Sequence, residues 1–169
     1  MKTVQSIAVL VALLLCIGSL PTEAKKYPYQ FTTDYTVQQI RVAKDGKKFV
    51  KVWGLGKNAD RAMDKARQNA VAACIFVGVA ATDIAGVVPP LCVGGQQDYE
   101  AHRAYFDQFF VTGDFLNYVV DTNSRYPTGQ DNVGTPDGRR VGIYVEVKYD
   151  ELRRKLEQDG IIKSLDSYF

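Results

Sequence analysis

The chain has 169 residues, of which 46% are hydrophobic and 11% aromatic, and its formal net charge is +2. This composition is typical of a folded domain with a hydrophobic core and excludes a disordered tail. The nearly balanced charge provides no basic surface field to drive binding to nucleic acid or to an anionic membrane. We therefore expect no nucleic-acid partner.

Residues 1–24 are typical of a secretory signal peptide. Lys2 supplies the positive start, residues 7–17 form an apolar run too short to span a bilayer, and Thr22-Glu23-Ala24 is a small-x-small cleavage site. The mature chain is then expected to begin at Lys25 and to work outside the cytoplasm, in the periplasm or at the outer membrane of a bacterial envelope. Residues 25–169 have the size of a single domain.

Cys16 offers an alternative to plain secretion, because it closes the apolar run and a lipidated cysteine would anchor the protein to a membrane. The lipoprotein peptidase needs a small residue before that cysteine, and Leu15 stands there. Cleavage after Ala24 is therefore the favoured prediction, and a lipoprotein anchored through Cys16 is the alternative.

Two strands and a tight turn are predicted at the start of the mature domain. Residues 35–42 read as the first strand, Asp45-Gly46 is a composition preferred in hairpin turns, and residues 49–55 continue as the second strand. Gly54, near the end of the second strand, leaves room for a close packing partner.

A long amphipathic helix is predicted next, with Asn58 as its N-cap. Its apolar positions recur at spacings of three and four and are mostly alanine: Ala59, Ala62, Met63, Ala66, Ala70, Ala73, Cys74 and Val77. Because alanine side chains are small, such a helix can approach a sheet closely. We expect it to lie flat on the apolar face of the hairpin.

Cys74 and Cys92 are the two cysteines of the mature chain. In an oxidising compartment such a pair is more often bonded than free, so an intrachain disulfide is predicted, worth about 3 kcal/mol in the chain-entropy model. Two buried thiols and an intermolecular bond are the alternatives. The single histidine, His102, cannot complete a Cys/His metal site, and we expect neither a metal ion nor a cofactor.

The most hydrophobic part of the mature chain is residues 71–93, in which Asp83 is the only charge. Gly78 and the Pro89-Pro90 pair argue against a membrane-spanning helix. We interpret the segment as the helix end followed by an apolar crossover, which either folds over the core or is exposed and docks on a partner. The predicted contact residues in it are Ile84, Val87, Val88 and Leu91.

Residues 98–110 are predicted to form a helix with an aromatic stripe. Its members recur at helical spacing and are Tyr99, His102, Tyr105, Phe106, Phe109 and Phe110. A stripe of this kind is usually part of the core. The alternative is a pocket for a small ligand or a glycan, lined by Tyr99, Tyr105, Phe106 and Phe109.

The last third of the chain is predicted to hold two strands, over residues 115–122 and 141–149, joined by a polar loop over residues 123–138. Asp150 is the predicted cap of a closing helix that Gly160 ends. The loop is longer than a connection needs to be, so it is a second candidate contact surface. Its predicted contact residues are Tyr126, Asp131 and Asp137.

The predicted element order is β-β-α-(α)-β-β-α. It defines an α+β fold in which an antiparallel sheet of about four strands, made of two hairpins, packs against the alanine-faced helix.

Three short motifs carry a resemblance to a known family: Val52-Trp53-Gly54-Leu55-Gly56, Ala62-x-x-x-Ala66-Arg67-x-x-Ala70 and Val77-Gly78-Val79. The pattern resembles the small α/β domain shared by the LPP20-type surface lipoproteins and the N-terminal part of the flagellar assembly protein FlgT. The strand over 141–147 and Leu152-x-x-x-Leu156 fit the same plan, whereas the crossover with its aromatic helix looks longer than the family's usual connection. The resemblance implies a noncatalytic domain that takes part in envelope assemblies.

Catalytic motifs are absent from the sequence, which contains no Gly-x-Ser-x-Gly, no His-Glu-x-x-His and no Cys/His pair at a known spacing. We therefore expect no enzyme, but a secreted or periplasmic module that binds another envelope component and supports the assembly or stability of a complex. The alternative is a soluble protein that binds a small ligand or glycan at the aromatic stripe. A third interpretation is attachment to a membrane surface through the crossover.

Overall fold

The computed structural model describes residues 26–122 and 126–164. The predicted signal peptide, including Cys16, lies outside the described residues. In chain order the elements are β1 (Val37–Arg41), β2 (Lys48–Gly56), α2 (Ala59–Phe76), α3 (Gln96–Ala101), α4 (Arg103–Thr112), the 3-10 helix η1 (Asp114–Tyr118), β3 (Val119–Asp121), the 3-10 helix η2 (Gly129–Asp131), β4 (Asn132–Thr135), β5 (Gly138–Val147) and α5 (Tyr149–Gln158).

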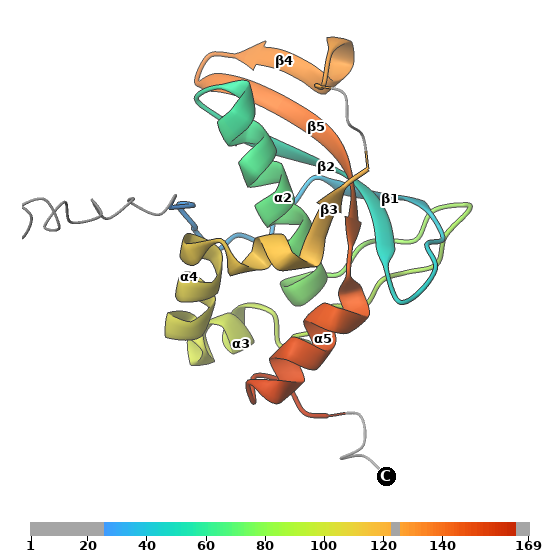
Figure 1. Ribbon diagram of the computed structural model, residues 1–169, viewed down its shortest axis with the longest axis vertical. Helices are drawn as coiled ribbons and strands as arrows, with labels where there is room; N and C mark the ends of the chain where they lie inside the picture. Colours follow the sequence, from blue (N-terminus) through green and yellow to red (C-terminus); the bar gives the residue numbers. More distant parts are fainter. Residues whose placement is uncertain (1–25, 123–125, 165–169) are drawn as a thin grey trace, which may run out of the picture.

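The strands form one antiparallel sheet, and the predicted α+β class is confirmed (Figure 1). The order is β1-β2-β5-β3, and β4 pairs with the first half of β5. Between the two central strands, Val50 lies opposite Val145 and Val52 opposite Ile143, and all four side chains are buried. These alternate positions define the core face of the sheet.

The first hairpin forms where it was predicted. Asp45 and Gly46 both have positive φ, at 56° and 68°, as in turns whose twist matches that of the flanking strands.

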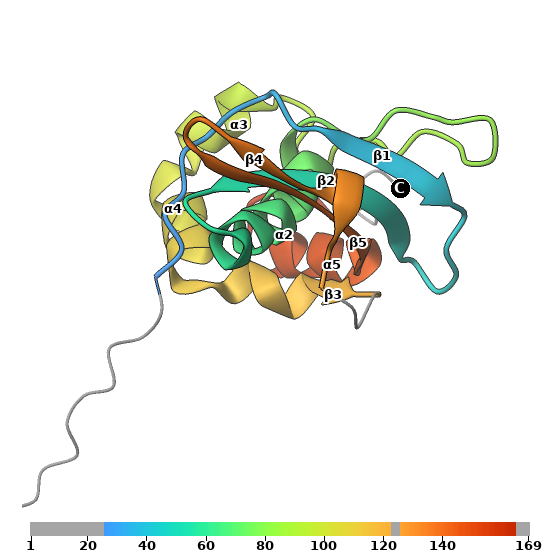
Figure 2. The same cartoon turned by 90° about the horizontal axis from the view of Figure 1, so that it is seen from above.

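Helix α2 covers the core face of the sheet, as the alanine spacing predicts (Figure 2). The Asn58 side chain accepts a hydrogen bond from the Arg61 backbone N–H at 2.9 Å, which confirms the N-cap. A Cβ at Gly54 would lie 2.2 Å from the carbonyl oxygen of Ala62 and 2.4 Å from the backbone nitrogen of Ala66. The close approach of helix and sheet therefore requires glycine at position 54.

The predicted aromatic helix is broken into α3 and α4 at His102, whose φ of −121° and ψ of 28° are not helical. The break turns α3 so that the Tyr99 ring faces the Phe106 ring at 6.2 Å, and both side chains are buried. A continuous helix is therefore the wrong prediction here, because packing of Tyr99 into the core redirects the chain.

The predicted strand over residues 115–122 is correct only in its second half. Gly113 ends α4 with a φ of 91°, and Leu116 N–H donates to the Gly113 carbonyl at 3.0 Å, which starts η1. This turn buries Phe115 completely, and only Val119–Asp121 form a strand.

The predicted polar loop contains a strand of its own. Strand β4 pairs with β5 through a tight turn in which Thr135 lies opposite Gly138, so the sheet has five strands where about four were expected. Helix α5 begins at Tyr149, and Asp150 is in its first turn and does not cap it. The Asp150 backbone N–H instead donates to the Gly46 carbonyl at 3.1 Å, which ties the helix start to the first hairpin.

The N-terminal segment 26–36 is an ordered arm along the aromatic helices. Tyr27 N–H donates to the Val111 carbonyl at 3.1 Å, the Tyr29 ring stacks on Phe110 at 4.0 Å, and the Phe31 ring stacks on Tyr99 at 4.5 Å. The arm thereby covers the aromatic part of the core.

Cys74 and Cys92 are free, buried thiols in the structure, in contrast to the predicted disulfide. They lie on neighbouring segments, because Leu91 N–H donates to the Cys74 carbonyl at 3.0 Å and Cys92 N–H to the Ile75 carbonyl at 2.7 Å. Burial raises the pKa of each thiol to about 12. Both are therefore protonated in the folded protein at neutral pH.

We expect iodoacetamide at about pH 8 to leave both thiols of the folded protein unmodified, and to alkylate both once the chain is unfolded. Intact mass before and after unfolding measures this directly. An unfolded chain that is alkylated only after a reductant is added would contradict the free thiols and restore the predicted disulfide.

Candidate functional site

The crossover forms a small projecting hairpin, residues 79–88, which we call the crossover hairpin. Val79 and Val88 exchange backbone hydrogen bonds of 2.8 and 2.9 Å, and Thr82 and Ala85 pair nearer the tip. In both views this loop, drawn in green, extends from the same side of the molecule as the turn between β1 and β2 (Figures 1 and 2).

The structure divides the predicted contact residues of the crossover into two groups. Ile84 and Val87 are exposed, at 66% and 68%, whereas Val88 and Leu91 are only 1% and 5% exposed. The prediction that Val88 and Leu91 contact a partner is therefore wrong. These two side chains belong to the core and hold the root of the crossover hairpin in place.

Below the hairpin, the Tyr149 hydroxyl donates to the Pro89 carbonyl at 2.7 Å. A Cβ at Gly78, whose φ is 80°, would lie 2.5 Å from the Val88 carbonyl oxygen. The root is thus fixed by close backbone packing and by a hydrogen bond to α5. The exposed tip is held on a rigid base.

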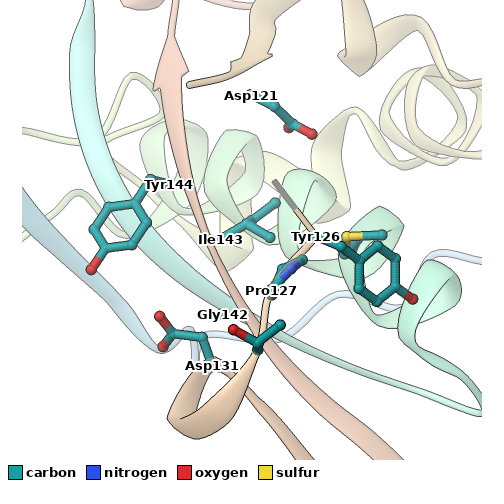
Figure 3. A pocket seen from close by; sticks show the side chains of 9 residues that line it. Asp121, Tyr126, Pro127, Asp131, Gly142, Ile143 and Tyr144 are labelled. Atoms are coloured by element: carbon teal, nitrogen blue, oxygen red, sulfur yellow. The ribbon is translucent and has the colours of Figure 1, made fainter. Parts of the chain in front are cut away.

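A small cavity of about 200 Å³ lies at the edge of β5, between the stretches that pair with β3 and with β4 (Figure 3). Tyr126 and Asp131, two predicted contact residues, line it together with Asp121, Gly142 and Tyr144. Asp137, the third predicted residue of this loop, is exposed in the β4–β5 turn and does not line the cavity.

Both carboxylates of this cavity are held in ion pairs. Asp131 Oδ1 lies 2.6 Å from Lys51 Nζ, and Asp121 Oδ1 accepts a hydrogen bond from Arg67 Nε at 2.9 Å. Burial of the Lys51 ammonium favours its neutral form, but the Asp131 carboxylate and the Tyr144 hydroxyl outweigh this and raise the Lys51 pKa. The first pair fixes the loop to β2, and the second joins the end of β3 to α2.

The face of the sheet opposite α2 carries a row of cations over aromatic rings, which the sequence analysis missed. Lys51 Nζ lies 4.9 Å from the Trp53 ring centroid and 5.0 Å from that of Tyr144. The Arg140 guanidinium lies 5.3 Å from the Trp53 ring. The alternation of Lys51 and Trp53 was readable in the sequence, but the pairing of Lys51 with Tyr144 depends on strand register.

The aromatic stripe does not form the predicted ligand pocket. Phe106 and Phe109 are buried among other rings, and the half-buried Tyr105 donates its hydroxyl to Asp159 at 2.6 Å. Tyr99 borders a shallow depression, together with residues of the N-terminal arm.

Within residues 26–122 and 126–164, no group of three or more His, Cys, Asp or Glu side chains is placed to hold a metal ion. The helices of the same described part are all too short or too polar to cross a membrane.

No protein-family model, curated protein or solved structure matches this chain. The resemblance to the envelope domains named above therefore stays a prediction that rests on the sequence motifs. The fold and the exposed surfaces define an α+β domain with a projecting apolar hairpin.

Proposed function

We propose that this chain is a noncatalytic, exported module that binds another component of a bacterial envelope and supports the assembly or stability of a complex. The observation that carries the proposal is the exposed tip of the crossover hairpin. Ile84 and Val87 face solvent on a rigid base, and two large aliphatic side chains on a projection favour burial against a partner.

The chemistry of the tip favours a protein partner over a lipid surface. Asp83 is exposed beside Ile84, and a carboxylate at the tip is costly to bring into the hydrocarbon region of a bilayer. A protein interface can place the same carboxylate at its polar rim while the aliphatic side chains fill its centre.

The test uses the double variant Ile84→Ser, Val87→Ser in the native host, with tagged protein crosslinked in cells. We expect the crosslinked complex to fall roughly tenfold in yield, because central apolar contacts dominate interface energy. Val120→Ser is the matched control, since Val120 is also an exposed valine, at 47%, but lies on β3, outside both candidate contact surfaces. Its complex is expected to form at the wild-type level.

Thermal unfolding of the purified variants separates association from folding. The double variant should melt within a few degrees of the control, because its side chains are exposed. A large fall in its melting temperature, or an unchanged complex, contradicts the proposal.

The N-terminal residue of the mature protein tests the predicted export. We expect mass spectrometry to identify Lys25 as that residue, whereas a lipid-modified Cys16 would select the lipoprotein alternative.

A further inference from the structure

A second, larger cavity lies between the N-terminal arm, the end of β2 and the first turns of α2. Its volume is about 410 Å³, within the range of small-molecule sites. The residues that line it are distinct from the crossover hairpin and from the sheet-edge cavity. Any ligand here would occupy a surface separate from the proposed docking tip.

Three of the residues that line this cavity are largely apolar. They are Tyr27 and Pro28 of the arm and Leu55 near the end of β2. Leu55 is 53% exposed although it is a large aliphatic residue. An alkyl group lying on these three side chains would remove apolar surface from water.

Four further lining residues are cations: Lys26, Lys57, Arg61 and Lys65. The one lining carboxylate is that of Asp64, which already forms an ion pair with Arg67, whose Nη1 lies 3.1 Å from Asp64 Oδ1.

Lys65 is the most constrained of these cations. Its Nζ donates to Gln68 Oε1 at 2.8 Å and lies 5.6 Å from the Tyr29 ring centroid, and the Gln68 side chain is almost completely buried. Among the described residues, no carboxylate lies within 4.0 Å of this nitrogen. Burial lowers the Lys65 pKa, as expected for an ammonium that has lost water without gaining a counter-ion.

We infer that this cavity binds a small anionic amphiphile, with its carboxylate or phosphate head paired to Lys65 and its alkyl part on Tyr27, Pro28 and Leu55. Arg61 and Lys57 at the exposed rim add positive charge around the head. A bound anion would supply the counter-ion that Lys65 lacks among the described side chains.

The experiment titrates the mature, full-length protein by calorimetry with octyl compounds below their micelle concentrations. Octanoate and octyl phosphate carry anionic heads, octyl glucoside a neutral head and octyltrimethylammonium a cationic head. We expect saturable binding of at least one anionic compound, roughly tenfold tighter than of the neutral or cationic ones. The tighter of the two anions identifies the head group as carboxylate or phosphate.

Acetate and inorganic phosphate test the alkyl part, and we expect them to bind roughly tenfold more weakly than their octyl counterparts. Binding that does not depend on head charge, the absence of saturable binding, or inorganic phosphate binding as tightly as octyl phosphate would each overturn the inference.

Variants locate the site. Lys65→Met keeps the packed stem and should weaken anion binding roughly tenfold while leaving octyl glucoside unchanged. Lys44→Met, in the exposed turn after β1, is the matched control and should bind like the wild type. If Lys65→Met unfolds, the double variant Lys57→Gln, Arg61→Gln on the exposed rim replaces it. This variant must bind the anionic compounds more weakly while its binding of octyl glucoside stays unchanged. Unchanged anion binding would overturn the assignment of the ligand to this cavity.

Discussion

Replacing Gly54 with alanine is expected to lower the free energy of unfolding by about 3 kcal/mol. The added methyl group would lie 2.2 Å from the Ala62 carbonyl oxygen, and Ala66 backbone atoms are at 2.4 and 3.0 Å. These are backbone atoms of a buried helix, so they cannot move aside as the end of a flexible side chain does. Relief requires α2 to shift away from the sheet and to lose packing along its alanine face.

Gly134→Ala is the matched control, because Gly134 is also a strand glycine but has no atom within 4 Å of an added Cβ. Its free energy of unfolding should change by no more than about 0.5 kcal/mol. Urea denaturation of both variants gives the comparison. Equal, small effects would show that the helix has room to adjust and that the close approach does not require glycine.

The sequence predicts those parts of the fold that depend on neighbours along the chain. The Asp45-Gly46 turn, the Asn58 cap and the three-and-four spacing of the alanines each have a local physical cause. The alternation of Val141, Ile143, Val145 and Val147 likewise reports a strand with one buried face, and all four are buried.

The predictions that fail depend on contacts that the composition of the segment itself does not show. The residues of β4 are polar and rich in turn formers, and they become a strand only because β5 offers an edge for pairing. Leu116, Tyr118 and Val120 alternate as in a strand. Burial of Phe115 beside the Tyr27 ring, at 5.4 Å, nevertheless favours a 3-10 turn over residues 114–118. The Tyr27 ring is far from Phe115 in the sequence, whereas β5 follows β4 directly through the turn at Pro136 and Asp137.

The candidate surfaces show the same division. The apolar composition of residues 84–91 predicts a segment that is either buried in the core or exposed as a contact surface. It does not predict which valine is exposed to solvent. Val87 and Val88 are adjacent and have opposite environments, because the bridge between Val79 and Val88 turns Val88 inward. The cavity between the N-terminal arm, β2 and α2 was not predicted from the sequence either, because Leu55 and Lys65 meet the arm only in the folded chain.

Replacing Phe106 with alanine is expected to lower the free energy of unfolding by about 4 kcal/mol. The side chain is completely buried, and its ring lies 4.7 Å from Phe76 and 5.3 Å from Tyr105. No solvent can fill the apolar space left behind at low cost, so both the transfer free energy and the cavity contribute.

Phe49→Ala is the control for Phe106→Ala, because Phe49 is half-buried on the opposite face of the sheet, under Arg41 at 4.6 Å. Its loss should cost only about 1 kcal/mol. The comparison also tests the assignment of the aromatic stripe to the core. A core stripe requires the large loss of stability at Phe106, whereas a ligand pocket requires a variant that folds normally and no longer gains thermal stability from its ligand.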